Sequence, residues 1–281
     1  MKQRASFKQW TFPAAAWRWV CRHPWVAVAL VLFGLALATF GELAEDLSAG
    51  GLGRFDRLVV GIVRAHPSPP LFLIARVFSA VLGWPALPGW LALLVVLLWL
   101  HRQRLLALAL AVIPTATSLL IEGLKAIFQR ARPLTALVYA LGHSFPSGHA
   151  AGAVVTYGLL AYIAWRCCVR GGRARLLIVL LAVLLILATG LSRIYLMVHY
   201  PSDVVAGWAA GTCILTGSLV LLESYRRRAR LAMGTQSGRT VASTASRRSA
   251  PSHGRFARRS IRPAVDSRPR FRYAVQPGVP A

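Results

Sequence analysis

The stretch from Ser192 to Asp203 reads SRIYLMVHYPSD and lies between two long apolar runs, residues 176–192 and 204–222. Each run is close to the roughly 20 residues that an α-helix needs to cross ~30 Å of hydrocarbon. The stretch itself places an arginine, a histidine and a carboxylate within twelve residues. We therefore expect a short polar connection between two membrane helices, with its functional groups at one membrane face.

The composition supports a membrane protein. Of the 281 residues 56% are hydrophobic and only 15% are charged, with a mean hydropathy of +0.56. Only helices or closed barrels satisfy backbone groups in lipid, and these runs are too long and uniformly apolar for barrel strands. Four further apolar runs cover residues 24–41, 88–100, 105–121 and 150–165. The fold class predicted is all-α, a six-helix transmembrane bundle. A short helix is expected over residues 55–65, either at the membrane interface or as an ordinary loop helix.

The basic residues predict topology and domain boundaries. Arginines and lysines near the span ends gather on one side, which places both termini in the cytoplasm. We expect residues 1–23 to be a basic cytoplasmic segment and 24–225 the six-span domain, with residues 24–41 either a retained signal-anchor or a cleaved signal peptide. Residues 226–272 hold fourteen arginines against one acid, Asp266. Residues 226–281 are expected to form a disordered cytoplasmic tail, drawn to anionic lipid headgroups, with no specific nucleic-acid partner.

Two other polar segments lie at the ends of apolar runs, on the face that carries residues 192–203. The first, residues 125–133, holds Lys125 and Arg132. Together with Arg193 these are three cations at the outer membrane surface, where charge is costly unless it is paired. Guanidinium groups match phosphate oxygens and a lysine adds a point charge, so a bound phosphate is a natural partner.

The second segment, Pro146-Ser147-Gly148-His149, opens an apolar run. Proline suits a first helical turn, and the free amides of a helix start, with glycine allowing close approach, form a cradle for anions. His199 and Asp203 are four residues apart. A carboxylate at this spacing can accept a hydrogen bond from one imidazole nitrogen and leave the other free to attack.

At this point a resemblance is plain. Lys125-x6-Arg132-Pro133, the Pro146–His149 tetrapeptide and Ser192-Arg193-x5-His199-x3-Asp203 resemble the three signature motifs of the type 2 phosphatidic acid phosphatase family, and every signature position is matched. The resemblance implies a phosphohistidine mechanism without metal or cofactor. The implied catalytic residues are His199, Asp203 and His149. The implied phosphate-binding residues are Lys125, Arg132, Ser147, Gly148 and Arg193.

The leading interpretation is a lipid phosphatase with its site facing the extracytoplasmic side of a bacterial inner membrane. By resemblance, its substrate is a polyprenyl diphosphate, a phosphatidylglycerophosphate or a phosphatidic acid. The first alternative is a phosphotransferase that uses the same intermediate. The second is a non-enzymatic membrane anchor with a basic lipid- or nucleic-acid-binding tail. No cluster of acids suits Mg²⁺, because Asp203 stands alone in its part of the sequence. Substrate identity, oligomeric state and the role of the tail stay open.

Overall fold

The computed structural model describes residues 24–50, 53–81 and 86–248. This part of the chain holds helices and no strands. The chain divides into two compact units, Met1–Ala229 and Arg230–Ala281. The helices are α2 (Pro24–Ser48), α3 (Gly53–Ala65), α4 (Pro69–Val81), α5 (Ala86–Leu100), α6 (Arg104–Phe128), α7 (Gly148–Cys167), α8 (Gly172–Tyr195) and α9 (Pro201–Arg248).

Among the described residues, five helices are long and apolar enough to cross a membrane: α2, α6, α7, α8 and residues 201–230 of α9. A sixth span is reached when α3 and α4 are taken together, although their axes are bent by 120°. The predicted all-α transmembrane bundle is therefore confirmed, with five to six candidate spans. The run at residues 88–100 lies in α5, whose 15 residues rise only about 22 Å, short of a full hydrocarbon layer.

The helix expected over residues 55–65 is present as α3, and its position at the membrane interface stays a prediction. Phe55, Leu58 and Ile62 follow helical spacing, and all three are exposed. The opposite face of α3 carries Asp56, which is buried. α3 is thus amphipathic in an unusual way, with its apolar residues facing outward and an acid facing the protein.

Two glycines bring α9 against α7. A Cβ added at Gly207 would lie 2.5 Å from the carbonyl oxygen of Ser147, and one at Gly211 would lie 2.7 Å from that of Ala151. Any side chain at these positions would push the two helices apart. The first turns of α7 and α9 are consequently neighbours, and the backbone N–H of Ser147 donates to the carbonyl of Asp203 at 2.9 Å.

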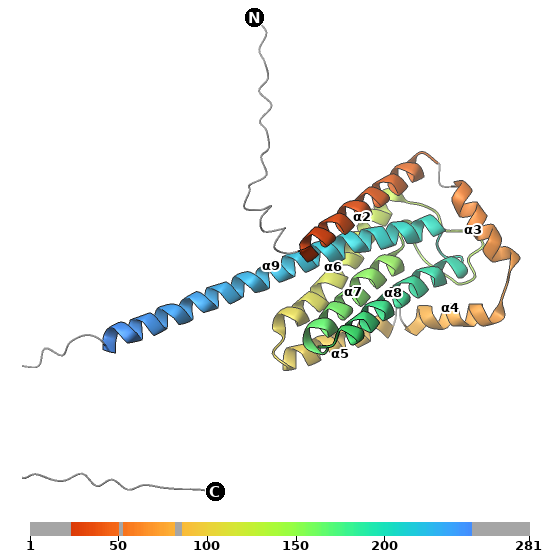
Figure 1. Cartoon of the computed structure of the whole chain (residues 1–281). Coiled ribbons are helices and arrows are strands. Elements are labelled where there is room, and N and C mark those ends of the chain that lie inside the picture. Colours follow the sequence, from red (N-terminus) through yellow and green to blue (C-terminus); the bar gives the residue numbers. More distant parts are fainter. Residues whose placement is uncertain (1–23, 51–52, 82–85, 249–281) are drawn as a thin grey trace, which may run out of the picture. The chain divides into compact units, whose positions relative to one another are not determined.

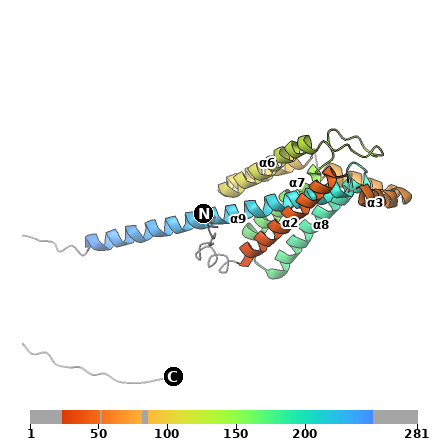
Figure 2. The ribbon, with the colours of Figure 1, turned by 90° about the horizontal axis from the view of Figure 1, so that it is seen from above.

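The polar segments meet at one end of the bundle because α6 and α8 end where α7 and α9 begin. α3 lies across this end, beside the start of α9 (Figure 1). A quarter turn shows the connection between α6 and α7 reaching the same end (Figure 2). Residues far apart in sequence are therefore close together here.

The prediction of a tail disordered from residue 226 does not hold for residues 226–248, which are helical as part of α9. Alanine, arginine, leucine and methionine are strong helix formers, and a helix extended from a folded span needs no new nucleus. Residues 249–281 lie outside the described part, as does the predicted N-terminal segment 1–23.

Candidate active site

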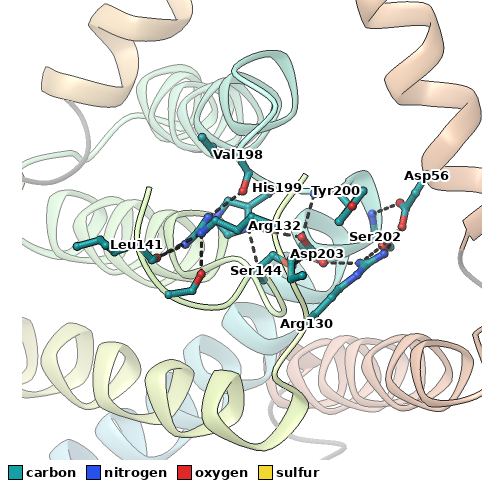
Figure 3. A network of polar contacts seen from close by, with 12 residues as sticks. Asp56, Arg130, Arg132, Leu141, Ser144, Val198, His199, Tyr200, Ser202 and Asp203 are labelled. Carbon is teal, nitrogen blue, oxygen red and sulfur yellow. Dashed lines mark hydrogen bonds and ion pairs between the residues drawn. The ribbon is translucent and has the colours of Figure 1, made fainter. Parts of the chain in front are cut away.

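His199 lies in the short connection between α8 and α9 and is 2% exposed. Its Nδ1 is 2.8 Å from the carbonyl oxygen of Ser144, and its Nε2 is 3.2 Å from Nη1 of Arg132 (Figure 3). A carbonyl can only accept, so Nδ1 carries the proton and Nε2 presents a lone pair. The imidazole is therefore held as the tautomer in which Nε2 is unprotonated, and the lone pair of Nε2 accepts from Nη1 of Arg132.

This arrangement corrects one expectation. The sequence predicts that Asp203 fixes the tautomer, but its Oδ2 is 3.6 Å from Nδ1 of His199, too far for a good hydrogen bond. The carbonyl of Ser144 takes that role instead. Asp203 contributes a negative charge beside the ring. Burial lowers the pKa of His199, and the charges of Arg132 and Arg193 lower it further, while Asp203 opposes them.

Asp203 is fully buried in the first turn of α9. Its Oδ1 accepts from Nη1 of Arg130 at 2.5 Å, and its Oδ2 accepts from the backbone N–H of Tyr200 at 2.9 Å. These charged and amide donors fix the position of both carboxylate oxygens. The position of Asp203 at a helix N-terminus adds a favourable interaction with the helix dipole.

Arg132 follows α6 and is half-buried. Its guanidinium donates to the carbonyls of Leu141, Gly142 and Val198, at distances from 2.8 to 3.2 Å. Burial lowers the pKa of this guanidinium, with the charge of Asp203 opposing the shift. Backbone carbonyls thus hold Arg132 in place beside Nε2 of His199, where the sequence alone suggests only a bound anion as its partner.

Arg193 and Ser147 differ from these residues in having buried polar atoms without partners. Arg193, at the end of α8, is 6% exposed and donates through Nη1 to the hydroxyl of Ser79. Across the part of the chain that the structure describes, the buried side-chain atoms lacking a hydrogen bond are Nε of Arg193, Oγ of Ser147 and Nε1 of Trp208. Two of these three belong to predicted phosphate-binding residues.

Ser147 is the N-cap of α7, and its side chain makes no capping hydrogen bond. The first amides of α7 therefore have no side-chain partner from this residue. A Cβ at Gly148 would lie 3.6 Å from Nζ of Lys125, so the lysine ammonium lies against this helix start. Lys125 also pairs with Glu122 at 2.7 Å.

His149 is half-buried in the first turn of α7. Its imidazole lies within electrostatic range of three cations and of the second site histidine: Arg193, Lys125, Arg132 and His199. The structure thus gathers at one end of the bundle all eight residues predicted as catalytic or phosphate-binding. They come from the ends of α6 to α9 and the connections between them.

Four residues of this network were missed in the sequence: Asp56, Arg130, Ser144 and Ser202. Arg130 binds Asp203 and also Asp56, which lies 2.6 Å from its Nη2. Asp203 stands alone in its part of the sequence, but in space it shares Arg130 with a second carboxylate, Asp56. Arg130 lies between the two carboxylates and pairs with both. Across the described residues no group of three His, Cys, Asp or Glu side chains is placed to hold a metal.

A cavity of about 510 Å³ lies beside the site, between the α3–α4 corner and the turn after α8. Its walls are mainly apolar and include Phe72, Leu137 and Met197, with Arg64 among the few polar lining residues. None of the predicted catalytic residues lines it. Met197 nonetheless precedes His199 by two positions, and Leu137 donates its backbone N–H to Leu196 at 3.0 Å.

Comparison with known proteins agrees with this architecture. Residues 104–227 match the profile described as the PAP2 superfamily. Phosphatidylglycerophosphatase B of Bacillus subtilis is 33% identical over 94 residues, a stretch that spans 33% of this chain and 46% of that relative.

The fold is also similar to the crystal structure of a transmembrane PAP2 type phosphatidylglycerolphosphate phosphatase from Bacillus subtilis. The TM-score is 0.62 with 21% identity, over 71% of this chain and 96% of that one. The chain is thus an integral membrane protein with the fold of that phosphatase. Residues 104–227, which match the PAP2 superfamily model, carry all three motifs.

Proposed function

We propose that this protein is a lipid phosphatase that hydrolyses a lipid phosphomonoester or diphosphate through a phosphohistidine intermediate. One observation carries the proposal. A buried imidazole holds an unprotonated Nε2 that accepts from Arg132, and near it lie the unpartnered donors of Arg193 and Ser147, all at one end of a membrane bundle. A nucleophile facing a cluster of anion donors is what phosphoryl transfer requires.

In the first step Nε2 of His199 attacks phosphorus in line, forming a P–N bond as the P–O bond to the lipid breaks. His149 gives its proton to the departing oxygen. Nη1 of Arg132 is 3.2 Å from Nε2, so a phosphoryl group on Nε2 lies beside this guanidinium. Asp203 stabilises the positive charge that develops on the imidazole ring.

In the second step His149 takes a proton from water, and the water oxygen attacks phosphorus. The P–N bond breaks, inorganic phosphate leaves, and His199 regains its free Nε2. In both steps the equatorial oxygens are stabilised by Lys125, Arg132, Arg193 and the donors at Ser147 and Gly148. No step needs a metal, because guanidinium groups take the charge-neutralising role that Mg²⁺ has in many phosphoryl transfers.

The apolar cavity supports a lipid as the substrate. Hydrocarbon walls around Phe72, Leu137 and Met197 suit an acyl or prenyl chain better than a sugar. With the chain in this cavity, the phosphate is delivered along the membrane surface. The substrate class is accordingly a polyprenyl diphosphate, a phosphatidylglycerophosphate or a phosphatidic acid, and the Bacillus relatives are named for the second of these.

The basic span ends support a site that faces the extracytoplasmic side of a bacterial inner membrane. On that side a polyprenyl carrier of envelope synthesis is a suitable substrate. The arginines of residues 226–230 then lie at the cytoplasmic surface, where anionic headgroups attract them. Accessibility of a single cysteine introduced at exposed His143, tested with an impermeant thiol reagent in a Cys-free protein, checks this orientation.

The test is phosphate release from a panel of these three lipid classes in detergent micelles containing EDTA. The wild-type protein should release phosphate from at least one lipid, and His199→Ala should lose about 10⁴-fold or more, as expected when a covalent nucleophile is removed. His101→Ala, at an exposed position between α5 and α6, is the matched control and should match wild type. Near-wild-type release by His199→Ala would contradict the proposal.

The same assay separates hydrolysis from transfer. We expect free inorganic phosphate as the product even when an acceptor lipid alcohol is added. Phosphate recovered on the acceptor lipid instead would identify a phosphotransferase with the same intermediate. Absence of turnover on every lipid phosphate, in a folded protein that still binds anionic vesicles, would favour the non-enzymatic anchor.

A further inference from the structure

Asp56 is a buried acid that the mechanism above does not use. It lies in the first turn of α3 and is only 2% exposed. Its Oδ2 accepts from Nη2 of Arg130 at 2.6 Å and from the hydroxyl of Ser202 at 2.7 Å, and its Oδ1 accepts from the backbone N–H of Ser202 at 3.0 Å. A carboxylate removed from water is costly unless every oxygen is paired, as here.

These contacts lead directly to the active site (Figure 3). Nη1 of Arg130 donates both to the Ser202 hydroxyl at 2.7 Å and to Oδ1 of Asp203 at 2.5 Å. The guanidinium also lies over the ring of Tyr200, 4.2 Å from its centroid. Arg130 is thus held from three directions, and one of its partners is the carboxylate beside His199.

Asp56 also acts on the helix that carries Asp203. Ser202 is the second residue of α9, so its backbone N–H belongs to the first turn and has no partner within the helix. Asp56 supplies that partner from α3, 146 positions away in sequence. A carboxylate here caps α9 as an N-cap side chain would, and it lies at the positive end of the helix dipole.

We propose that Asp56 is a positioning residue for the nucleophile. Through Arg130 and Ser202 it fixes the Asp203 carboxylate and the first turn of α9 relative to His199. The inference rests on the proposed phosphatase function and deepens it, because it adds a residue outside the three motifs, contributed by helix α3.

Charge gives the physical reason for two carboxylates around one guanidinium. If Arg130 were paired with Asp203 alone, its charge would largely cancel the field that Asp203 exerts on the imidazole. Asp56 shares the guanidinium, so the group of three carries a net negative charge next to His199. That charge favours the positive imidazole formed during attack, while the fork of Arg130 keeps Oδ2 of Asp203 turned toward the ring.

The experiment compares Asp56→Asn with wild type in steady-state turnover of the lipid phosphate that the wild-type protein hydrolyses. Asparagine keeps the shape and removes the charge. We expect kcat to fall about 10–100-fold, the range found when a residue that supports a catalytic side chain is replaced. KM should stay within about twofold, because Asp56 does not contact the substrate. Asp46→Asn, the same change at an exposed position of α2, should leave both constants unchanged.

A double-mutant cycle separates positioning from a merely structural role. If Asp56 acts through Asp203, adding Asp56→Asn to Asp203→Asn should lower kcat less than about twofold further. Full multiplication of the two losses would overturn the proposal, as would an Asp56→Asn protein with wild-type kcat. Turnover by the wild-type protein in the same assay tests the proposed phosphatase function independently. The positioning role of Asp56 can therefore be rejected without rejecting the phosphatase function.

Discussion

The two sides of the site use their polar atoms in opposite ways. On the side of the α8–α9 turn, His199 and Asp203 have protein partners that fix the ring and the carboxylate. On the other side, Nε of Arg193 and Oγ of Ser147 are buried without partners in the described part of the chain. A buried donor without a partner is costly, so a protein keeps one where a ligand will use it. We infer that the first side is built to stay rigid and the second to receive phosphate.

The largest effect is expected when the buried guanidinium on the phosphate-receiving side is removed. Arg193→Gln should lower kcat/KM by about 10²–10³-fold, because a donor to the transition-state oxygens is lost. Arg173→Gln, at the exposed opposite end of α8, is the control and should be close to wild type. Initial rates on micellar lipid phosphate measure both. An Arg193→Gln enzyme within threefold of wild type would show that this guanidinium is not a phosphate ligand.

The two sides must also be held at the correct separation, and Gly207 sets it. Gly207→Ala places a Cβ 2.5 Å from the Ser147 carbonyl, so α7 and α9 must move apart, at about 1–3 kcal/mol of stability. We expect a lower Tm and an activity loss of about tenfold or more, because small displacements of catalytic groups greatly lower the reaction rate. Gly217→Ala, on the same helix with nothing within 4 Å of the added Cβ, should change neither quantity. Equal behaviour of the two variants would contradict the close packing.

Two fully buried serines give a sharper contrast. Ser147→Ala removes a hydroxyl without a partner, so kcat/KM should fall about tenfold while Tm stays the same or rises. Ser202→Ala removes a hydroxyl bonded to Asp56 and Arg130, so Tm should fall by an amount equivalent to about 1 kcal/mol or more. Thermal unfolding in detergent, measured beside activity, tests both. A Tm loss for Ser147→Ala as large as for Ser202→Ala would remove the distinction between the two sides.

The smallest expected effect concerns pH. Burial lowers the pKa of His199, and this outweighs the opposing charge of Asp203. The neutral imidazole, which is the attacking form, therefore persists as pH falls through the ordinary histidine value of about 6.5. We expect the acid limb of kcat/KM to lie below that value, in a profile measured from about pH 4 to 9. An acid limb well above about 6.5 would mean that the imidazole is not held neutral as described.

Much of the fold and most of the site could be predicted from the sequence, because both depend on periodic or local signals. Runs of apolar residues indicate the spans, and their alternation brings Lys125, His149 and Arg193 to one end. The α3–α4 corner was less predictable, since prolines and glycines mark a break without giving its angle. The continuation of α9 through residues 226–248 was missed because an arginine-rich composition suggests disorder, although arginine is also a good helix former.

The missed contacts have two different causes. The tautomer of His199 is set by the backbone carbonyl of Ser144, and a carbonyl leaves no trace in residue identity. Asp56 acts across 146 positions, so no local spacing links it to Ser202. One signal was available: Arg130 lies within the Lys125–Arg132 spacer and is a charge at membrane depth that needs a partner. A search for that partner would have led to Asp203 and then to Asp56.

The central claim is that the separate polar segments form one pocket in which His199 accepts a phosphoryl group. Rapid acid-free quenching of the wild-type protein during turnover of a ³²P-labelled lipid phosphate, followed by peptide mapping, tests it most directly. Acid-labile, base-stable label should appear on the peptide containing His199 and be absent from His199→Ala. Label on a serine, or turnover with no covalent label within the dead time of a burst experiment, would contradict the account.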